Sequence, residues 1–300
     1  MEFITMLLPV FAIFVLGYAG QKKFRLDLKG ISTISMYIMS PFLVFRTFYQ
    51  TEFHADYYYM ILFSLLMCLG IIIVVYFIAS LKKYSQAETC GMILASAFMN
   101  SGNYGIPVVL MLFGEAGVDY AIVLMVNQSL LVSTIGIYIA AKGSPQGNGI
   151  KEALRSVFHM PMLYGAVLGI LFQMLHIPLS IPVFSVVDLV ANAAVPTIMI
   201  LLGMQLANIS VQQLEKRKVS LSLSLKLAVS PLLAYVITLF LPVDPLLKQI
   251  MIIIAAMPTA ANTTMLALQY NTKPEFVSSA TFFSTLLSLA TLPVIFTIVM

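Results

Sequence analysis

The sequence predicts an all-α membrane protein with ten transmembrane helices. Of its 300 residues, 60% are hydrophobic and only 9% are charged, whereas a soluble domain carries about 25% charged residues. Long apolar runs fill the chain in place of short alternating segments, which excludes a transmembrane β-barrel. The basic side chains fall in alternate loops, as helical membrane proteins require. The net charge of +4 is too small and too scattered for a nucleic-acid surface.

Charged residues divide the chain into stretches that can each supply the roughly 20 residues needed to cross a bilayer. The runs without any charge cover residues 3–21, 57–81, 89–114, 120–141, 249–272 and 276–300. Four further spans are expected at about 29–51, at about 219–241, and on either side of residues 176–182 within 156–207. The expected total is ten.

The loop charges predict the orientation of these helices. Thirteen lysines and arginines lie in the loops that follow the odd-numbered helices, and Lys248 alone lies in the others. The positive-inside rule therefore puts both termini outside the cytoplasm. The first half then starts outside and the second half inside, which is the condition for an inverted repeat of five plus five helices. We expect repeats at 1–141 (helices 1–5) and 156–300 (helices 6–10), joined by a cytoplasmic linker at 142–155.

Helices 4 and 9 are each interrupted near the middle. Residues 100–107 read Asn-Ser-Gly-Asn-Tyr-Gly-Ile-Pro, and residues 258–264 read Pro-Thr-Ala-Ala-Asn-Thr-Thr. Unwound backbone survives at that depth only where it lines a polar cavity or is buried in protein. Half-helices that start near Pro107 and near Asn262 would point positive N-terminal ends at such a cavity, and these ends favour an anion. Ordinary proline kinks are the alternative.

Polar residues in the other helices sharpen this interpretation. Asn127 and Gln128 lie mid-helix 5, either as links between helices or as cavity-lining donors. The middle of the membrane contains no acid or histidine, which disfavours both a cation exchanger and an intramembrane enzyme. Two cysteines and three scattered histidines do not supply a metal site.

Three charged residues fall inside the predicted spans. Arg46 and Asp188 both lie one to two turns below the outer surface, where they either pair or extend to the interface. Lys226 lies about two turns from the inner surface, on one face with Ser222 and Ser230. We expect Lys226 to extend to the interface.

The motif at 100–107 resembles the helix 4 crossover of the auxin efflux carrier family, and residues 258–293 resemble helices 9 and 10 of that family. The resemblance implies a secondary transporter with an elevator-like mechanism and a fold similar to bile-acid sodium symporters. Helices 1, 2, 6 and 7 would form the scaffold. It further implies that a substrate carboxylate binds at the crossover. The candidate substrate-binding residues are Asn100, Asn103, Tyr104, Gly105, Pro107, Val108, Asn127, Gln128, Pro258, Asn262 and Thr263.

Two departures from the plant members argue against auxin itself. Val44 stands where those carriers have a serine, and their long central loop is absent. Short prokaryotic members look like permeases for small carboxylates such as malate or malonate. We therefore expect a plasma-membrane permease, secondary active or facilitative, whose partners are a small organic anion and the lipid bilayer. The alternative is a Na⁺/proton-coupled cation antiporter of the same architecture. The coupling ion (Na⁺ or H⁺), the transport direction and a homodimer stay open, and no cofactor is expected.

Overall fold

The computed structural model describes residues 2–50, 55–144, 161–208 and 215–299, and every regular element in these ranges is a helix. Six helical segments are long and apolar enough to cross a membrane: Leu28–Gln50, Asp56–Lys82, Glu115–Gly143, Ile181–Asn208, Lys216–Leu239 and Pro274–Val299. Three shorter apolar helices cover Ser101–Phe113, Pro161–Met174 and Pro245–Ala255. The all-helical fold is thus confirmed for the described residues and is consistent with a membrane protein, while ten spans and an inverted repeat stay predictions. Most of the predicted linker, residues 145–155, lies outside the described residues.

The helices form two compact units, and each unit draws on both halves of the sequence. The first unit contains the described residues of 1–57, 102–126 and 158–208, and the second contains those of 58–101, 127–157 and 209–300. The expected scaffold helices 1, 2, 6 and 7 all fall in the first unit, which also takes in part of helices 4 and 5. The units are therefore different from the two predicted sequence repeats, which stay untested.

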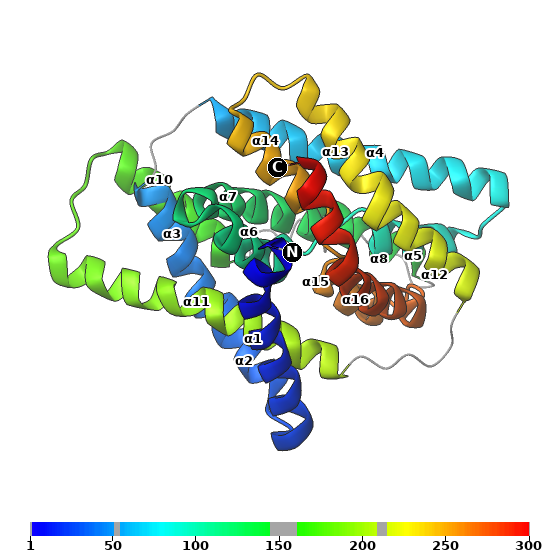
Figure 1. The fold of residues 1–300 in the computed structure, drawn as a ribbon, viewed down its shortest axis with the longest axis horizontal. Helices are drawn as coiled ribbons and strands as arrows, with labels where there is room; N and C mark the ends of the chain where they lie inside the picture. Colours follow the sequence, from blue (N-terminus) through cyan, green and yellow to red (C-terminus); the bar gives the residue numbers. More distant parts are fainter. Residues whose placement is uncertain (1, 51–54, 145–160, 209–214, 300) are drawn as a thin grey trace. The chain divides into compact units, whose positions relative to one another are not determined.

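Close helix pairs hold the first unit together. Its elements are α1 (Glu2–Phe24), α2 (Leu28–Ile34), η1 (Ser35–Met39), α3 (Ser40–Gln50), η2 (Ser101–Gly105), α6 (Ile106–Phe113), part of α7 (Glu115–Leu131), α10 (Pro161–Met174) and α11 (Ile181–Asn208). Helix α1 packs along α11, and α10 packs along α3 (Figure 1). A Cβ atom on Gly17 of α1 would lie 2.1 Å from the carbonyl oxygen of Ile200 on α11. A Cβ atom on Gly169 of α10 would lie 2.7 Å from the carbonyl oxygen of Phe45 on α3. Only glycine permits such close backbone approach.

The second unit is built around a buried apolar core. Its remaining elements are α4 (Asp56–Lys82), α5 (Gln86–Ser96), η3 (Val132–Gly136), α8 (Ile137–Gly143), α12 (Lys216–Ser224), η4 (Leu225–Val229), α13 (Ser230–Leu239), α14 (Pro245–Ala255), α15 (Ala261–Gln269) and α16 (Pro274–Val299). The core includes Cys68 of α4, Phe98 and Val277 of α16. Cys68 and Cys90 are both free thiols buried in it.

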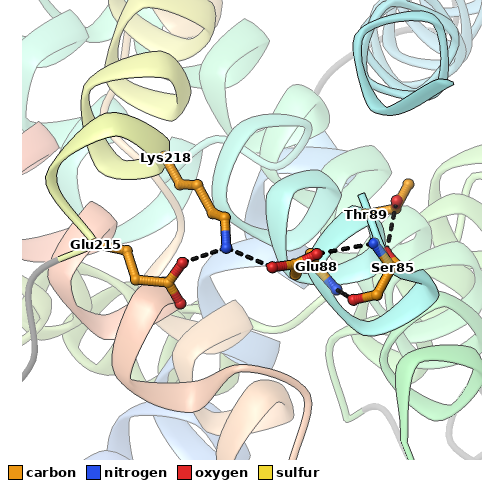
Figure 2. Close-up of polar contacts among 5 residues, drawn as sticks. All are labelled: Ser85, Glu88, Thr89, Glu215 and Lys218. Carbon is orange, nitrogen blue, oxygen red and sulfur yellow. Dashed lines mark hydrogen bonds and ion pairs between the residues drawn. The ribbon is translucent and has the colours of Figure 1, made fainter. Parts of the chain in front are cut away.

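Helix α5 begins with a capping box that is tied to α12 (Figure 2). The Ser85 amide donates to Glu88 Oε2 at 2.8 Å, and the Glu88 amide donates back to Ser85 Oγ at 3.3 Å. Lys218 of α12 forms ion pairs with both Glu88 and Glu215. The hydrogen bond from Lys218, with a further one from the Ser85 backbone, lowers the pKa of Glu88 from 4.5 to about 2. This contact fixes the start of α5, the helix that leads into the first predicted interruption.

Candidate substrate site

The two predicted interruptions exist and meet inside the second unit. Helix α5 ends at Ser96, α14 ends at Ala255, and between them Met99 and Thr259 form an isolated antiparallel β-bridge. The Asn100 N–H donates to the Pro258 carbonyl at 2.9 Å, and the Ala260 N–H donates to the Phe98 carbonyl at 3.1 Å. The unwound backbone of each segment is therefore satisfied by the other, as buried backbone must be.

The freed carbonyls at the ends of α5 and α14 are each capped by side chains. Thr259 Oγ1 donates to the Ala95 carbonyl at 2.6 Å. Ser230 Oγ donates to the Ala255 carbonyl at 3.0 Å, and Lys226 Nζ donates to the same oxygen at 3.4 Å. The C-terminal end of a helix carries a negative partial charge, which suits a cation.

Lys226 is a correction to the sequence analysis. Its side chain is 0% exposed, so the expectation that it extends to the interface is wrong. It lies in η4, a π-helical turn, and its amine is held at the end of α14 inside the second unit. The Ala255 carbonyl supplies an acceptor that compensates part of the cost of burial.

The π-helical turns also correct the expected start of the half-helix in the first interrupted segment. Helical turns resume at Ser101 in η2 and run into α6 at Ile106, with Gly105 itself helical at φ −66° and ψ −47°. Pro107 therefore lies in the first turn of α6 but not at a free N-terminus, and the expectation of one there is wrong. Proline lacks an N–H and clashes with the preceding turn, and a wider π turn removes the clash without breaking the helix.

The same arrangement recurs at two other prolines. Turn η1 ends at Met39, two residues before Pro41, and η4 ends at Val229, two residues before Pro231. In contrast, α15 starts at Ala261 after extended backbone at Ala260, so the expected half-helix start near Asn262 is confirmed. A π turn thus precedes Pro41, Pro107 and Pro231, whereas Pro9, Pro196 and Pro293 lie inside α-helices without one. The genuine interruption coincides with the bridge.

Six candidate residues fall in the second unit: Asn100, Asn127, Gln128, Pro258, Asn262 and Thr263. Asn262 is exposed, and Thr263 is buried with its hydroxyl donating to the Ala260 carbonyl at 2.8 Å. Three side-chain amide nitrogens, Asn100 Nδ2, Asn127 Nδ2 and Gln128 Nε2, are buried and have no acceptor within the described part of the chain. These are the unmet donors that a bound acceptor would satisfy.

Helix 5 lies against both interrupted segments in this unit. A Cβ atom on Gly136 of η3 would lie 3.4 Å from Phe98 and 3.5 Å from Leu266 of α15. Asn127 and Gln128 lie about two turns earlier on the same continuous helix, which runs from α7 through η3 to α8. The amide donors therefore belong to elements that pack together.

Five candidates fall in the first unit: Asn103, Tyr104, Gly105, Pro107 and Val108. Asn103 is half-buried, and the other four are buried. The Tyr104 ring packs against Phe14 and Phe11 of α1, with ring centroids 5.3 and 6.4 Å apart. This packing accounts for the burial of Tyr104, and its role as a substrate contact stays a prediction.

The first unit also contains the predicted ion pair between Arg46 and Asp188. Arg46 Nη1 lies 2.7 Å from Asp188 Oδ1 and donates to Asn192 Oδ1 at 2.6 Å. Asn192, one turn further along α11, donates to Asp188 Oδ2 at 3.0 Å. Of the two interpretations left open, the structure therefore has the pair.

Sequence reasoning missed that three side chains cap the freed carbonyls at the two helix ends: Thr259, Ser230 and Lys226. A signal was present, because Lys226 is the sole charge within the apolar run 219–241 and stands five residues before Pro231. Among the described residues, no group of three or more His, Cys, Asp or Glu side chains could hold a metal ion.

Comparison with known proteins places this chain in a family. A protein named "Uncharacterized transporter" from Methanothermobacter thermautotrophicus is 29% identical over 281 residues, which cover 93% of this chain and 90% of the relative. A protein named "Putative malonate transporter" from Rhizobium meliloti is 25% identical over 311 residues, covering 97% and 93%. The family model described as "Membrane transport protein" matches residues 2–296. The resemblance to auxin efflux carriers is thereby confirmed, and the chain belongs to this family of membrane transporters and not to an enzyme family.

Proposed function

We propose that this protein is a secondary active or facilitative carrier for a small organic anion, with the crossover as its substrate site. The observation that carries the proposal is the set of three buried amide nitrogens without acceptors: Asn100 Nδ2, Asn127 Nδ2 and Gln128 Nε2. Each N–H₂ group can only donate, so its natural partner is an acceptor such as a carboxylate. Leaving a buried donor unpaired costs about 1–3 kcal/mol, and a bound anion would recover that energy.

The charge around these donors also suits an anion. The described acidic residues of the second unit lie at or near the ends of helices, as with Glu88 in the first turn of α5 and Glu275 in the first turn of α16. No carboxylate therefore competes with an incoming anion at the bridge. A cation antiporter of the same architecture would need an acid or a comparable set of ligands there.

The wider architecture follows from the same proposal. The carrier has ten transmembrane helices in a 5+5 inverted repeat, lies in the plasma membrane with both termini outside, and works by an elevator-type alternation. The close contacts in the first unit support the repeat. Gly17 meets the carbonyl of Ile200, four residues after Pro196, and Gly169 meets the carbonyl of Phe45, four residues after Pro41. Equivalent helix pairs thus use equivalent positions.

The substrate is a small carboxylate, and dicarboxylates such as malonate are the first candidates. Support comes from the Rhizobium meliloti relative, whose name refers to malonate and which aligns with 97% of this chain. Three donors on packed helices also match the several acceptor oxygens of a compact carboxylate better than those of a large apolar anion.

The test is uptake of radiolabelled malonate, malate and succinate into proteoliposomes, comparing the natural sequence with Asn127→Ala and Asn100→Ala, which each remove one of the unmet donors. We expect saturable uptake of at least one carboxylate, and its loss by about tenfold or more in both variants, since one charge-assisted hydrogen bond contributes about 1.5–3 kcal/mol.

Gln249→Ala is the matched control, because this amide already donates to the Val299 carbonyl at 3.1 Å and should leave uptake unchanged. Normal uptake by both asparagine variants would refute the site. Exchange of Na⁺ against protons without any carboxylate would instead favour the antiporter.

A further inference from the structure

The two interrupted helices expose backbone carbonyls inside the second unit, and such carbonyls are what a coupling cation binds in carriers with broken helices. At the end of α5 the Ala95 carbonyl is occupied by the neutral hydroxyl of Thr259. At the end of α14 the Ala255 carbonyl is occupied by Ser230 and by the amine of Lys226. Side chains of the protein thus donate to both carbonyls, where a coupling cation would otherwise bind.

The two donors at Ala255 differ from the one at Ala95 in charge. Lys226 is fully buried, and its amine can hold a proton or release it. The carbonyl that it contacts lies three residues before Pro258, whose own carbonyl accepts the Asn100 N–H of the bridge. The amine therefore lies at the end of the helix that leads into the segment bridged to Asn100.

Within the part of the chain that the structure describes, no carboxylate forms an ion pair with the amine. Elements α5, α12, α13 and α16 pack against η4, and α14 contributes the Ala255 carbonyl. Their titratable or charged residues are Glu88, Cys90, Lys216, Arg217, Lys218, Tyr235, Lys248 and Glu275. Both acids lie in first turns, and Glu88 is paired with Lys218. A charged ammonium in such surroundings is costly unless an anion joins it.

We propose that Lys226 is the coupling site of the carrier, so that proton binding to its amine takes the place of Na⁺ binding at the end of α14. The amine takes up a proton when the anion binds, and the resulting ammonium gives that proton back to water after the anion leaves. No other reactant is needed. The inference rests on the proposed function, because it assigns the driving ion of that same site.

Linkage explains why one amine suffices. A carboxylate bound near the amine favours its protonated form, and protonation favours carboxylate binding by the same factor, because coupling between two sites is reciprocal. When the amine carries one proton with each malonate and the membrane potential is held at zero, a pH difference of one unit can support about a tenfold accumulation.

The experiment measures malonate accumulation in proteoliposomes under three conditions: a pH gradient with acid outside, an inward Na⁺ gradient, and no gradient. We expect about tenfold accumulation per pH unit with the pH gradient, and none with Na⁺ alone. Accumulation driven by Na⁺ and indifferent to pH would overturn the inference while leaving the proposed function intact. Absence of malonate, malate and succinate transport in every condition would instead refute the proposed function.

Two variants test Lys226 itself. Lys226→Gln removes the proton-binding amine, and Lys226→Arg keeps a cation that cannot release its proton. Both should lose the about tenfold accumulation that the pH gradient drives, and any malonate exchange that remains should no longer change with pH. Lys248→Gln, which alters a lysine in the first turn of α14, should keep both activities. Accumulation by a folded Lys226 variant that still follows the pH gradient would overturn the inference, and Lys226→Arg serves if Lys226→Gln fails to fold.

Discussion

The two interrupted segments share a backbone arrangement but differ in how their helix ends are capped. Residues 98–100 and 258–260 contribute one donor and one acceptor each to the bridge. The Ala95 carbonyl then accepts a neutral hydroxyl from the opposite segment, whereas the Ala255 carbonyl accepts a hydroxyl and an amine from the neighbouring helix. Met99 occupies the place that corresponds to Thr259 across the bridge, and its thioether side chain has no hydrogen to donate to Ala255.

This difference shows which features of the two interrupted segments are required by the pairing of buried backbone groups and which are free to vary. Buried backbone groups must be paired, so both interruptions need the same bridge. A freed carbonyl needs a donor but does not specify which one. The end of α5 could therefore acquire a neutral cap and the end of α14 a titratable one. The two ends share a backbone arrangement but differ in the chemistry of their capping side chains.

The largest stability effect in this comparison is expected from Thr259→Val. Valine keeps the shape but removes the hydroxyl that donates to the Ala95 carbonyl at 2.6 Å, the only side-chain donor to that oxygen among the described residues. A buried carbonyl left unpaired costs about 1–3 kcal/mol. A thiol-reactive dye measures this, because Cys68 and Cys90 are each 1% exposed and become reactive when the second unit unfolds. An unchanged melting temperature would show that the hydroxyl is not needed.

Ser230→Ala should have a smaller effect at the equivalent place. The Ala255 carbonyl keeps the Lys226 amine as a second donor after the serine hydroxyl is removed. We expect a loss of less than about 1 kcal/mol, near the net contribution of a typical hydrogen bond. The same dye assay compares the two variants directly. If Ser230→Ala costs as much as Thr259→Val, the amine does not act as a cap.

The smallest effect is expected where the two interrupted helices begin. Glu88 ties α5 to Lys218, whereas Asp244 at the start of α14 only caps its own helix by accepting the Leu246 N–H. Since the folded pKa of Glu88 is about 2 against an ordinary 4.5, the stability from this pair is complete above pH 4.5 and is lost as the pH falls towards 2. The pair is partly exposed to solvent, so screening keeps its contribution within about 1 kcal/mol.

Glu88→Gln tests this pH dependence. The natural sequence should melt slightly higher than the variant at pH 6, and the difference should disappear between pH 4.5 and 2. Asp244→Asn is the control, because asparagine also caps a helix and no ion pair is lost. A difference that persists at low pH would mean that Glu88 acts through packing and not through its charge.

Much of the fold could be read from the sequence because membrane spans obey simple rules. Length and hydrophobicity identify the apolar helices, and residues 100–107 and 258–264 contain polar and helix-breaking residues that mark the interruptions. The exact break could not be read. Pro107 looked like a helix start, but the preceding π turn absorbs it, and the interruption falls at 97–100. A proline constrains its own turn, whereas the break depends on a partner segment about 160 residues away.

The sequence by itself determined that this chain is a bundle of membrane helices with two polar interruptions, because a bilayer leaves the backbone no other solution. Tertiary structure alone decided which partners the polar groups at each interruption have. It buried Lys226 at the end of α14 instead of letting it reach water, and it left the amides of Asn100, Asn127 and Gln128 without acceptors in the described residues. Hydropathy is a property of single segments, whereas the pairing of a buried donor depends on which other segments fold against it.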